Sequence, residues 1–282
     1  MALARDRVTN DLQTFEPFAK EVAYIRVNEK LVRRLLARLR AKTHIRLLDV
    51  AAGTGLMTAV ISGQAEARGT KVDSTLIDLD RPALELARDE VHTPRAQYIY
   101  ALADRLPLRG KFDAAIFANS IHLLDDEAKA RALSEVHRVL EPSGVLGVNS
   151  TFYGGAYPEE SKPFYSRWMR RAIAEMNQRL PNRVKSEKGQ AMEWLGAEDY
   201  RSLIECNGFR VVEMRERRVG LSQAAVRAIS SYKEFAKGAL HASEEDAEEA
   251  SRALQVTVQR TFRDLNMKLL SRNWLELIAV RA

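Results

Sequence analysis

The chain has 282 residues, of which 46% are hydrophobic and 29% are charged. This composition is that of a globular protein, and it excludes collagen-like, low-complexity and largely disordered classes. The net charge of +6 favours an anionic partner, but solubility alone also favours a charge of this size. The basic residues gather within residues 30–42 and 167–188, which fits either solvated helix faces or anion-facing surfaces.

The compartment follows from what the sequence lacks. Its single cysteine, Cys206, cannot form an internal disulfide, which indicates a reducing environment. No apolar run reaches the roughly 18 residues that a membrane-spanning helix needs, and the first residues contain no signal-peptide core. We therefore predict a cytoplasmic protein with no membrane insertion, while nothing in the sequence indicates its oligomeric state.

Helical and strand patterns alternate along the first half of the chain. Apolar residues recur every three or four positions over residues 15–41, which predicts a helix. Strands are predicted at residues 45–50, 74–78, 98–101, 112–118 and 145–150, separated by helical patterns that include residues 126–140. This alternation predicts a doubly wound parallel sheet.

The pattern changes after Ser150. Helices are predicted at residues 161–179, 197–207 and within 221–270, and strands at 209–219 and 273–280. Ser243, with the acidic residues that follow it, is typical of a helix N-cap and an acidic first turn. We expect one domain built from a helical cap at 1–43, a core at 44–150, and lid helices with the remaining strands at 151–282.

A glycine loop follows the first predicted strand, with the sequence Asp-Val-Ala-Ala-Gly-Thr-Gly at residues 49–55. A strand that ends in Gly-x-Gly and opens a helix lets the backbone approach a ligand closely. Asp78 ends the second strand, where a carboxylate can accept hydrogen bonds from both ribose hydroxyls. Asp80 is better placed than Asp78 to cap the next helix. The pattern predicts a nucleotide-like ligand.

Two ligand classes use this geometry. A dinucleotide loop places a third glycine at position 58, where this chain has Thr58. Asp49, four residues before Gly53, has no standard task in such a loop. Beside a sulfonium ligand, a carboxylate there can anchor the amino-acid end through intervening groups or water. The residues therefore favour S-adenosylmethionine over a nicotinamide dinucleotide.

Residues 49–55 resemble the first motif of class I S-adenosylmethionine-dependent methyltransferases, with Ala51 in place of that motif's first glycine. Residues 76–88 resemble the second motif, residues 106–124 the third and fourth, and residues 139–144 the turn before the fifth strand. The chain is most similar to the small-molecule branch that includes ubiquinone and menaquinone C-methyltransferases. This resemblance implies a Rossmann-like α/β fold: a seven-stranded, mostly parallel sheet whose last strand is antiparallel, with helices on both faces and added lid helices.

The resemblance also implies a set of cofactor contacts. These are Asp49, Ala51, Gly53, Thr54, Gly55, Asp78, Leu79, Ala103, Asp104, Asn119 and Ser120. The family often binds the adenine amine with an aspartate at the position of Leu102, so either Asp104 or the backbone of Ala103 takes over that contact here. No metal is expected, because the histidines and the lone cysteine have no metal-ligand spacing.

Methyl transfer from a sulfonium is an in-line displacement, in which the protein aligns the reacting groups and excludes water. His122, just past the fourth strand, is a candidate general base, although it can equally cap or pack beneath the next helix. Tyr24 can line the pocket or belong to the core. The helical additions favour a small, partly apolar substrate, and the nearby basic residues suit an anionic group on it.

Two other functions stay open. The basic stretches fit a methyltransferase acting on RNA or protein. The fourth strand, however, is not followed by the Asn/Asp-Pro-Pro-aromatic motif that grips a flipped base, and no nucleic-acid module is visible, so nucleic acid is not the expected partner. A non-catalytic S-adenosylmethionine-binding scaffold would carry the same binding residues, and turnover would exclude it.

Overall fold

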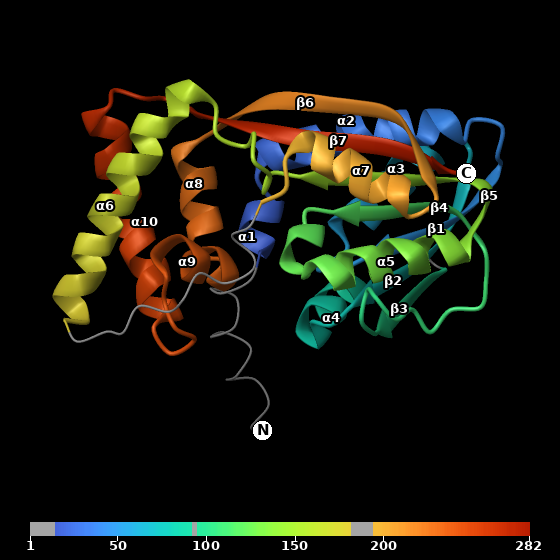
Figure 1. The fold of residues 1–282 in the computed structure, drawn as a ribbon, viewed down its shortest axis with the longest axis horizontal. Coiled ribbons are helices and arrows are strands. Elements are labelled where there is room, and N and C mark those ends of the chain that lie inside the picture. The colour runs from blue at the N-terminus through green and yellow to red at the C-terminus, as the bar shows by residue number, and fades with distance from the viewer. Residues whose placement is uncertain (1–14, 92–94, 182–193) are drawn as a thin grey trace. The chain divides into compact units, whose positions relative to one another are not determined.

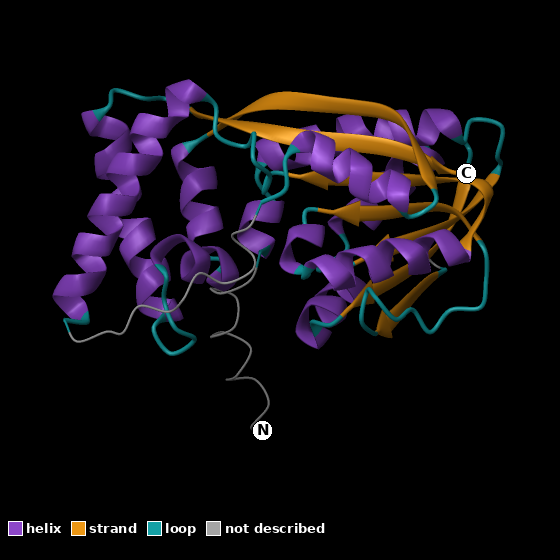
Figure 2. Cartoon of the chain, viewed as in Figure 1, coloured by secondary structure: helices purple, strands orange, loops and turns teal. Residues whose placement is uncertain are grey.

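The computed structural model describes residues 15–91, 95–181 and 194–282, which form two compact units (Figure 1). The sheet unit contains described residues within 26–91, 95–156, 194–217 and 273–282. The helical unit contains described residues within 15–25, 157–181 and 218–272. Figure 2 distinguishes the strands from the helices.

In the described part of the sheet unit, seven strands form one sheet in the order β3-β2-β1-β4-β5-β7-β6. Neighbours among β1 to β5 are parallel, whereas β7 runs antiparallel to β5. The predicted mostly parallel sheet with an antiparallel last strand is therefore confirmed. The strands are β1 (His44–Val50), β2 (Lys71–Asp78), β3 (Ala96–Tyr100), β4 (Phe112–Ala118), β5 (Leu140–Ser150), β6 (Phe209–Leu221) and β7 (Leu270–Arg281).

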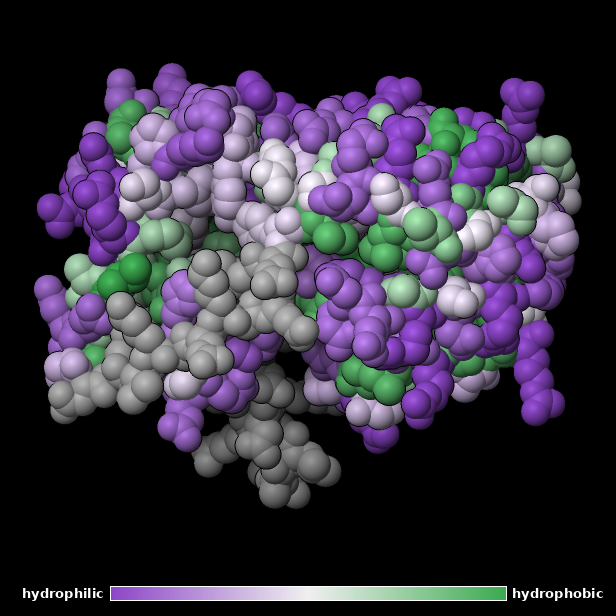
Figure 3. Space-filling model, in the orientation of Figure 1, coloured by the Kyte–Doolittle hydropathy of each residue, from purple (hydrophilic) through white to green (hydrophobic). Residues whose placement is uncertain are grey.

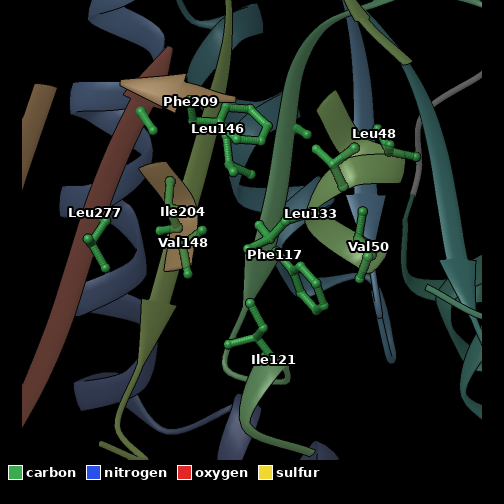
Figure 4. Packing of buried hydrophobic residues seen from close by; sticks show 14 of the residues in the cluster. Leu48, Val50, Phe117, Ile121, Leu133, Leu146, Val148, Ile204, Phe209 and Leu277 are labelled. Atoms are coloured by element: carbon green, nitrogen blue, oxygen red, sulfur yellow. The ribbon is translucent and has the colours of Figure 1, made fainter. Parts of the chain in front are cut away.

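Helices cover both faces of this sheet. Leu133 of α5 and Ile204 of α7 pack against Phe117 and Val148 on one face (Figure 4). On the other face, leucines of α2 and the apolar side of α3 pack over β1, β4 and β5. These strands are buried on both sides, which explains their nearly continuous apolar sequences. The helices are α2 (Val22–Arg38), α3 (Leu56–Glu66), α4 (Arg81–Glu90), α5 (Asp126–Val139) and α7 (Ala197–Cys206), with a short 3-10 turn, η1 (Ile121–Leu123).

The register of the sheet places the ends of three strands together. Val50 lies beside Ile77 of β2 and beside Phe117 of β4. Because β1, β2 and β4 are parallel, the residues that follow them emerge at the same edge of the sheet. This carboxyl edge carries the glycine loop and the predicted ribose-binding Asp78.

The helical unit has its own core. Phe164 and Trp168 of α6 are buried, and the Trp168 indole N–H donates to the Leu254 carbonyl of α10 at 3.0 Å. Phe164 and Trp168 are therefore core residues of this unit. Its helices are α1 (Glu16–Ala19), α6 (Lys162–Arg179), α8 (Gln223–Ser230), α9 (Lys233–Leu240) and α10 (Ala247–Asp264), with a short 3-10 turn, η2 (Glu159–Ser161).

Strands β2 and β7 each begin three residues before their predicted start, and three other elements differ from their predicted bounds in more informative ways. The helix predicted over residues 15–41 is interrupted between α1 and α2. Strand β5 begins at Leu140, five residues before the predicted start. There its register against β4 shifts, and Ser143 adopts a φ of 62°. Helix α10 begins at Ala247, so Ser243 is not its N-cap.

The surface shown in Figure 3 is hydrophilic over most of its area, with scattered apolar side chains. Among the described residues, no helix is both long and apolar enough to cross a membrane.

Candidate functional site

The loop after β1 is held in a tight conformation at the carboxyl edge of the sheet. The Ala52 N–H donates to the Ile77 carbonyl at 3.0 Å, and the Gly55 N–H donates to the Ala52 carbonyl at 2.9 Å. Ala51, Gly53 and Gly55 all have positive φ, of 53°, 54° and 80°. Thr54 lies between the two glycines. The family's preference for glycine at the position of Ala51 therefore has a backbone cause, since an alanine is strained there.

The two glycines of the loop have different surroundings. A Cβ on Gly55 would clash with Val91 and would lie 3.2 Å from the Cβ of Ala87. Gly55 therefore lets α4 pack tightly against the loop. A Cβ on Gly53 would meet no atom within 4 Å. This open space beside a positive-φ glycine is the kind of surface that a ligand can approach closely.

Asp49 supports the loop from within the core. It is 1% exposed, and its Oδ2 accepts hydrogen bonds from both the N–H and the hydroxyl of Thr58, at 3.1 and 2.7 Å. Burial raises the pKa of Asp49 to about 7; the two bonds from Thr58 oppose this rise, and the negative charge of Asp78 adds to it. Asp49 thus joins β1 to the first turn of α3, and Thr58 is a partner that the sequence did not indicate.

Asp78 lies at the end of β2, next to the loop. Its two carboxylate oxygens accept from the Gly53 N–H at 2.7 Å and from the Asp80 N–H at 2.8 Å. Burial raises the pKa of Asp78, against the effect of these bonds. Asp80 is the N-cap of α4 and accepts from the Ala83 N–H at 3.1 Å, as predicted. Asp78 is therefore left facing the loop, and each of its oxygens can accept further bonds.

Polar atoms without partners lie past the end of β4. Asn119 Nδ2 and Ser120 Oγ are both buried, and neither has a hydrogen-bond partner among the described residues. Asn119 is 8% exposed and has a φ of 55°. Buried donors of this kind are costly unless a ligand or water satisfies them.

The two candidate catalytic residues are both buried. His122 is 7% exposed, in η1, and its ring stacks on Phe152 with centroids 4.1 Å apart. Tyr24 is 4% exposed and makes an edge contact with Phe15 and a tilted ring contact with Phe18, both of the helical unit. His122 lies at the carboxyl edge, as predicted, and its stack fits the packing alternative as well. Tyr24 belongs to an aromatic cluster.

The predicted cofactor contact Leu79 follows β2, and the residues considered for adenine binding, Leu102 to Asp104, follow β3. Leu79 and Leu102 are 49% and 43% exposed, unusually high values for leucine, and Ala103 packs against the sheet core. The Asp104 carboxylate pairs with Arg131 Nε at 3.0 Å. Asp104 thus already has a cationic partner, and the contacts of these residues with adenine stay predictions.

Several basic residues of the two predicted stretches pair with acids of the same chain. Arg34 pairs with Glu276, a buried carboxylate of β7, and Arg179 pairs with Glu249 at 3.1 Å. Arg183, Lys185 and Lys188 lie outside the described residues. Part of the basic charge is therefore neutralised within the fold.

A comparison with protein families identifies the region that contains this edge. Residues 47–144 match the profile of a methyltransferase domain. Over these residues the chain is similar to class I methyltransferases. Enzymes of this family take their methyl group from S-adenosylmethionine.

Relatives of the methyltransferase domain include enzymes of quinone biosynthesis. A demethylmenaquinone methyltransferase of Chlamydia pneumoniae is 31% identical over 121 residues, covering 43% of this chain and 48% of that protein. A ubiquinone/menaquinone biosynthesis C-methyltransferase of Rickettsia typhi is 27% identical over 202 residues, covering 66% of this chain and 75% of that protein. The chain spans under half the length of two of the curated relatives that it matches.

Solved structures show the same fold. A crystal structure of a putative sarcosine dimethylglycine methyltransferase from Galdieria sulphuraria aligns with a TM-score of 0.54 at 16% identity. The alignment covers 92% of this chain and 86% of that one.

The residues at the carboxyl edge fit an S-adenosylmethionine ligand on structural grounds. Gly53 borders open space, Asp78 offers acceptors for ribose hydroxyls, and Asn119 and Ser120 carry buried polar atoms that lack partners. The carboxylate of Asp78 beside the loop also suits a ligand that carries a cationic sulfonium.

Proposed function

We propose that the protein transfers a methyl group from S-adenosylmethionine to a small, partly apolar molecule that carries an anionic or strongly polar group. The observation that best supports this proposal is the combination, at one sheet edge, of the open Gly53, the carboxylate of Asp78 and the unpartnered amide nitrogen of Asn119. Gly53 allows the donor to approach the loop backbone closely, Asp78 can accept hydrogen bonds from its ribose, and Asn119 can bond to a polar group of the donor.

The names of the relatives support the substrate class. The two curated relatives described above are named for demethylmenaquinone and for ubiquinone and menaquinone biosynthesis, and quinones are largely apolar small molecules. The basic surface residues favour an anionic substituent on the acceptor. An RNA or protein methyltransferase is the alternative that the net charge of +6 favours.

The chain's own residues would bind, orient and shield the reactants. Bound S-adenosylmethionine supplies a methyl group on a sulfonium, already activated for displacement. The loop and Asp78 would fix the donor, and the surrounding core would exclude water, which is the main demand of an in-line transfer. We assign the acceptor's proton to His122 when the acceptor loses one during transfer.

The first experiment is binding of S-adenosylhomocysteine and NAD, measured by native mass spectrometry and calorimetry. We expect a stoichiometric complex with S-adenosylhomocysteine and none with NAD. Asp78→Ala should weaken S-adenosylhomocysteine binding by about 1.5–3 kcal/mol, because charge-assisted hydrogen bonds are lost. Asp80→Ala is the matched control, since Asp80 caps α4, and it should bind normally.

Turnover tests the acceptor class. Formation of S-adenosylhomocysteine should be stimulated by demethylated quinols and other small phenolic acceptors, and not by RNA or a protein extract. Stimulation by RNA or protein alone would favour the alternative. Binding of S-adenosylhomocysteine with no turnover on any acceptor would instead indicate a cofactor-binding scaffold.

A further inference from the structure

The positive charge of the sheet unit is concentrated along helix α2. Residues 26–42, which comprise most of α2 and the turn after it, contain seven basic residues and one acidic residue. Their formal charge of +6 equals the net charge of the whole chain. Helices α5 and α7, on the opposite face of the sheet (Figure 1), together contain six acidic and four basic residues. The two faces of the sheet unit therefore differ in the sign of their charge.

The packing of α2 determines which of its sides meets solvent. Leu31 and Leu35 are fully buried in the core beneath the helix. Arg26, Lys30 and Arg33 are all exposed, and their spacing of three or four residues places them in one line along the outer side of the helix. We call these three side chains the basic stripe. Because the apolar side of α2 is already used in the core, a partner can bind the basic stripe without any change of fold.

The basic stripe is available to an external anion. Arg34, beside it in the sequence, pairs with the buried Glu276, whereas no residue of the basic stripe forms an ion pair within the described part of the chain. Glu29, the one acidic residue of residues 26–42, is half-buried. Arg38 and Arg40 are exposed and extend the positive surface beyond the basic stripe. A row of exposed cations without acidic partners attracts an anionic surface.

The residues around the basic stripe distinguish between anionic partners. Proteins that bind single-stranded RNA stack its bases on aromatic side chains. The single aromatic residue of α2, Tyr24, is buried. An anionic lipid surface, in contrast, requires only cations within about 10 Å of its headgroups at 0.1 M salt, whatever residues lie between them. The acceptor proposed above is largely apolar and therefore collects in lipid, which favours a lipid surface as the partner.

We propose that the basic stripe binds the anionic headgroups of a lipid membrane and holds the protein at the surface from which it takes its apolar acceptor. The choice of lipid rests on the proposed function, whereas the charge and exposure of α2 do not depend on it. The binding is electrostatic and reversible, and α2 does not enter the bilayer, because its apolar side is buried in the core.

Co-sedimentation with lipid vesicles tests this proposal. The vesicles contain phosphatidylcholine alone or with about one third phosphatidylglycerol. At about 0.1 M salt the unaltered protein should partition onto the anionic vesicles at least about 100-fold more strongly, and most of this preference should disappear at about 0.5 M salt. The triple variant Arg26→Gln, Lys30→Gln, Arg33→Gln should reduce this partitioning about 100-fold. Glutamine is a good helix former, so α2 should stay folded.

Two control variants separate the position of the charge from its amount and its shape. Arg170→Gln, Arg252→Gln and Arg260→Gln together remove the same charge from exposed arginines of α6 and α10. This second triple variant should bind anionic vesicles within about 3-fold of the unaltered protein, because charges distant from the basic stripe are screened.

The conservative variant Arg26→Lys, Arg33→Lys keeps the charge of the basic stripe but removes the guanidinium fork. It should also bind anionic vesicles within about 3-fold of the unaltered protein, because attraction to a lipid surface depends on charge and not on fork geometry. Loss of vesicle binding in this variant would indicate recognition of individual phosphates, as in an RNA complex, and would overturn the proposal.

The remaining outcomes separate this inference from the proposed function. Equal partitioning onto neutral and anionic vesicles, or an equal loss in the two triple variants, would refute membrane binding by the basic stripe and leave the proposed function intact. Self-association that the first triple variant abolishes would assign α2 to a second copy of the chain and would also overturn the proposal. Failure to bind S-adenosylhomocysteine would refute the proposed function, whereas vesicle binding would still test the surface of α2.

Discussion

Asp49 should make the stability of the protein depend on pH in a direction unusual for an aspartate. Burial raises its pKa from 3.8 to about 7 in the folded state. Between these values the unfolded chain loses the proton while the folded protein keeps it. The free energy of unfolding therefore falls as pH rises, by about 1.4 kcal/mol per pH unit and about 4 kcal/mol in total.

The variant Asp49→Asn isolates this effect from other titrating groups. Both bonds from Thr58 end on the single atom Oδ2, so the amide oxygen of asparagine can accept both of them. Between about pH 5 and about pH 8 the unaltered protein should lose about 2–3 kcal/mol relative to the variant. Urea unfolding across this range measures the difference. Parallel stability curves for the two proteins would show that Asp49 ionises normally, and the reasoning from burial would fail.

Three further predictions concern packing, charge and chemistry. Gly55→Ala should lower the free energy of unfolding, measured by urea titration, by about 2–4 kcal/mol, because the new Cβ overpacks the site and strains the backbone. Gly53→Ala should lower it by only about 1 kcal/mol, because its Cβ enters open space. Glu276→Gln should cost about 2–4 kcal/mol, because it removes the buried carboxylate that pairs with Arg34 and, at 2.7 Å, with Arg217. If the free energy of unfolding falls by less than about 1 kcal/mol in Glu276→Gln, these ion pairs contribute little to stability. His122→Ala should reduce the rate at saturating acceptor by about 100-fold with an unchanged Kd for S-adenosylhomocysteine, whereas full turnover would assign His122 to packing.

The succession of strands along the chain was predictable because each strand carries a local signal. Apolar runs such as that of β4 are long enough to be buried on both faces, and the glycine loop marks the first crossover. The role of Asp80 as an N-cap was predictable for the same reason, since it depends only on residues within one turn.

Contacts between distant residues were not predictable in this way. Ser243 has the local features of an N-cap, yet Glu244 forms ion pairs with Lys233 and Lys237, and α10 begins three residues later. These pairs bring the pKa of Glu244 down to about 2.

The candidate site shows the same division. The sequence indicated Asp49 and Asn119 as cofactor contacts through family resemblance, but it did not indicate what holds them. Thr58 donates to Asp49, and Thr151 donates to Asn119, each from another element. No rule of sequence spacing relates the two members of either pair. The left-handed backbone at Asn119 also had no signal, because asparagine is common in ordinary turns.

The position of β7 in the sheet has a consequence for how the protein folds during synthesis. β7 lies between β5 and β6 in space, yet the ribosome makes it after every other strand. Until residues 270–281 emerge, β5 has an open edge and β6 has no neighbour to pair with. The sheet is therefore completed only after all its other strands exist, and the growing chain carries the exposed edge of β5, a known risk for aggregation, while the residues between β5 and β7 are made.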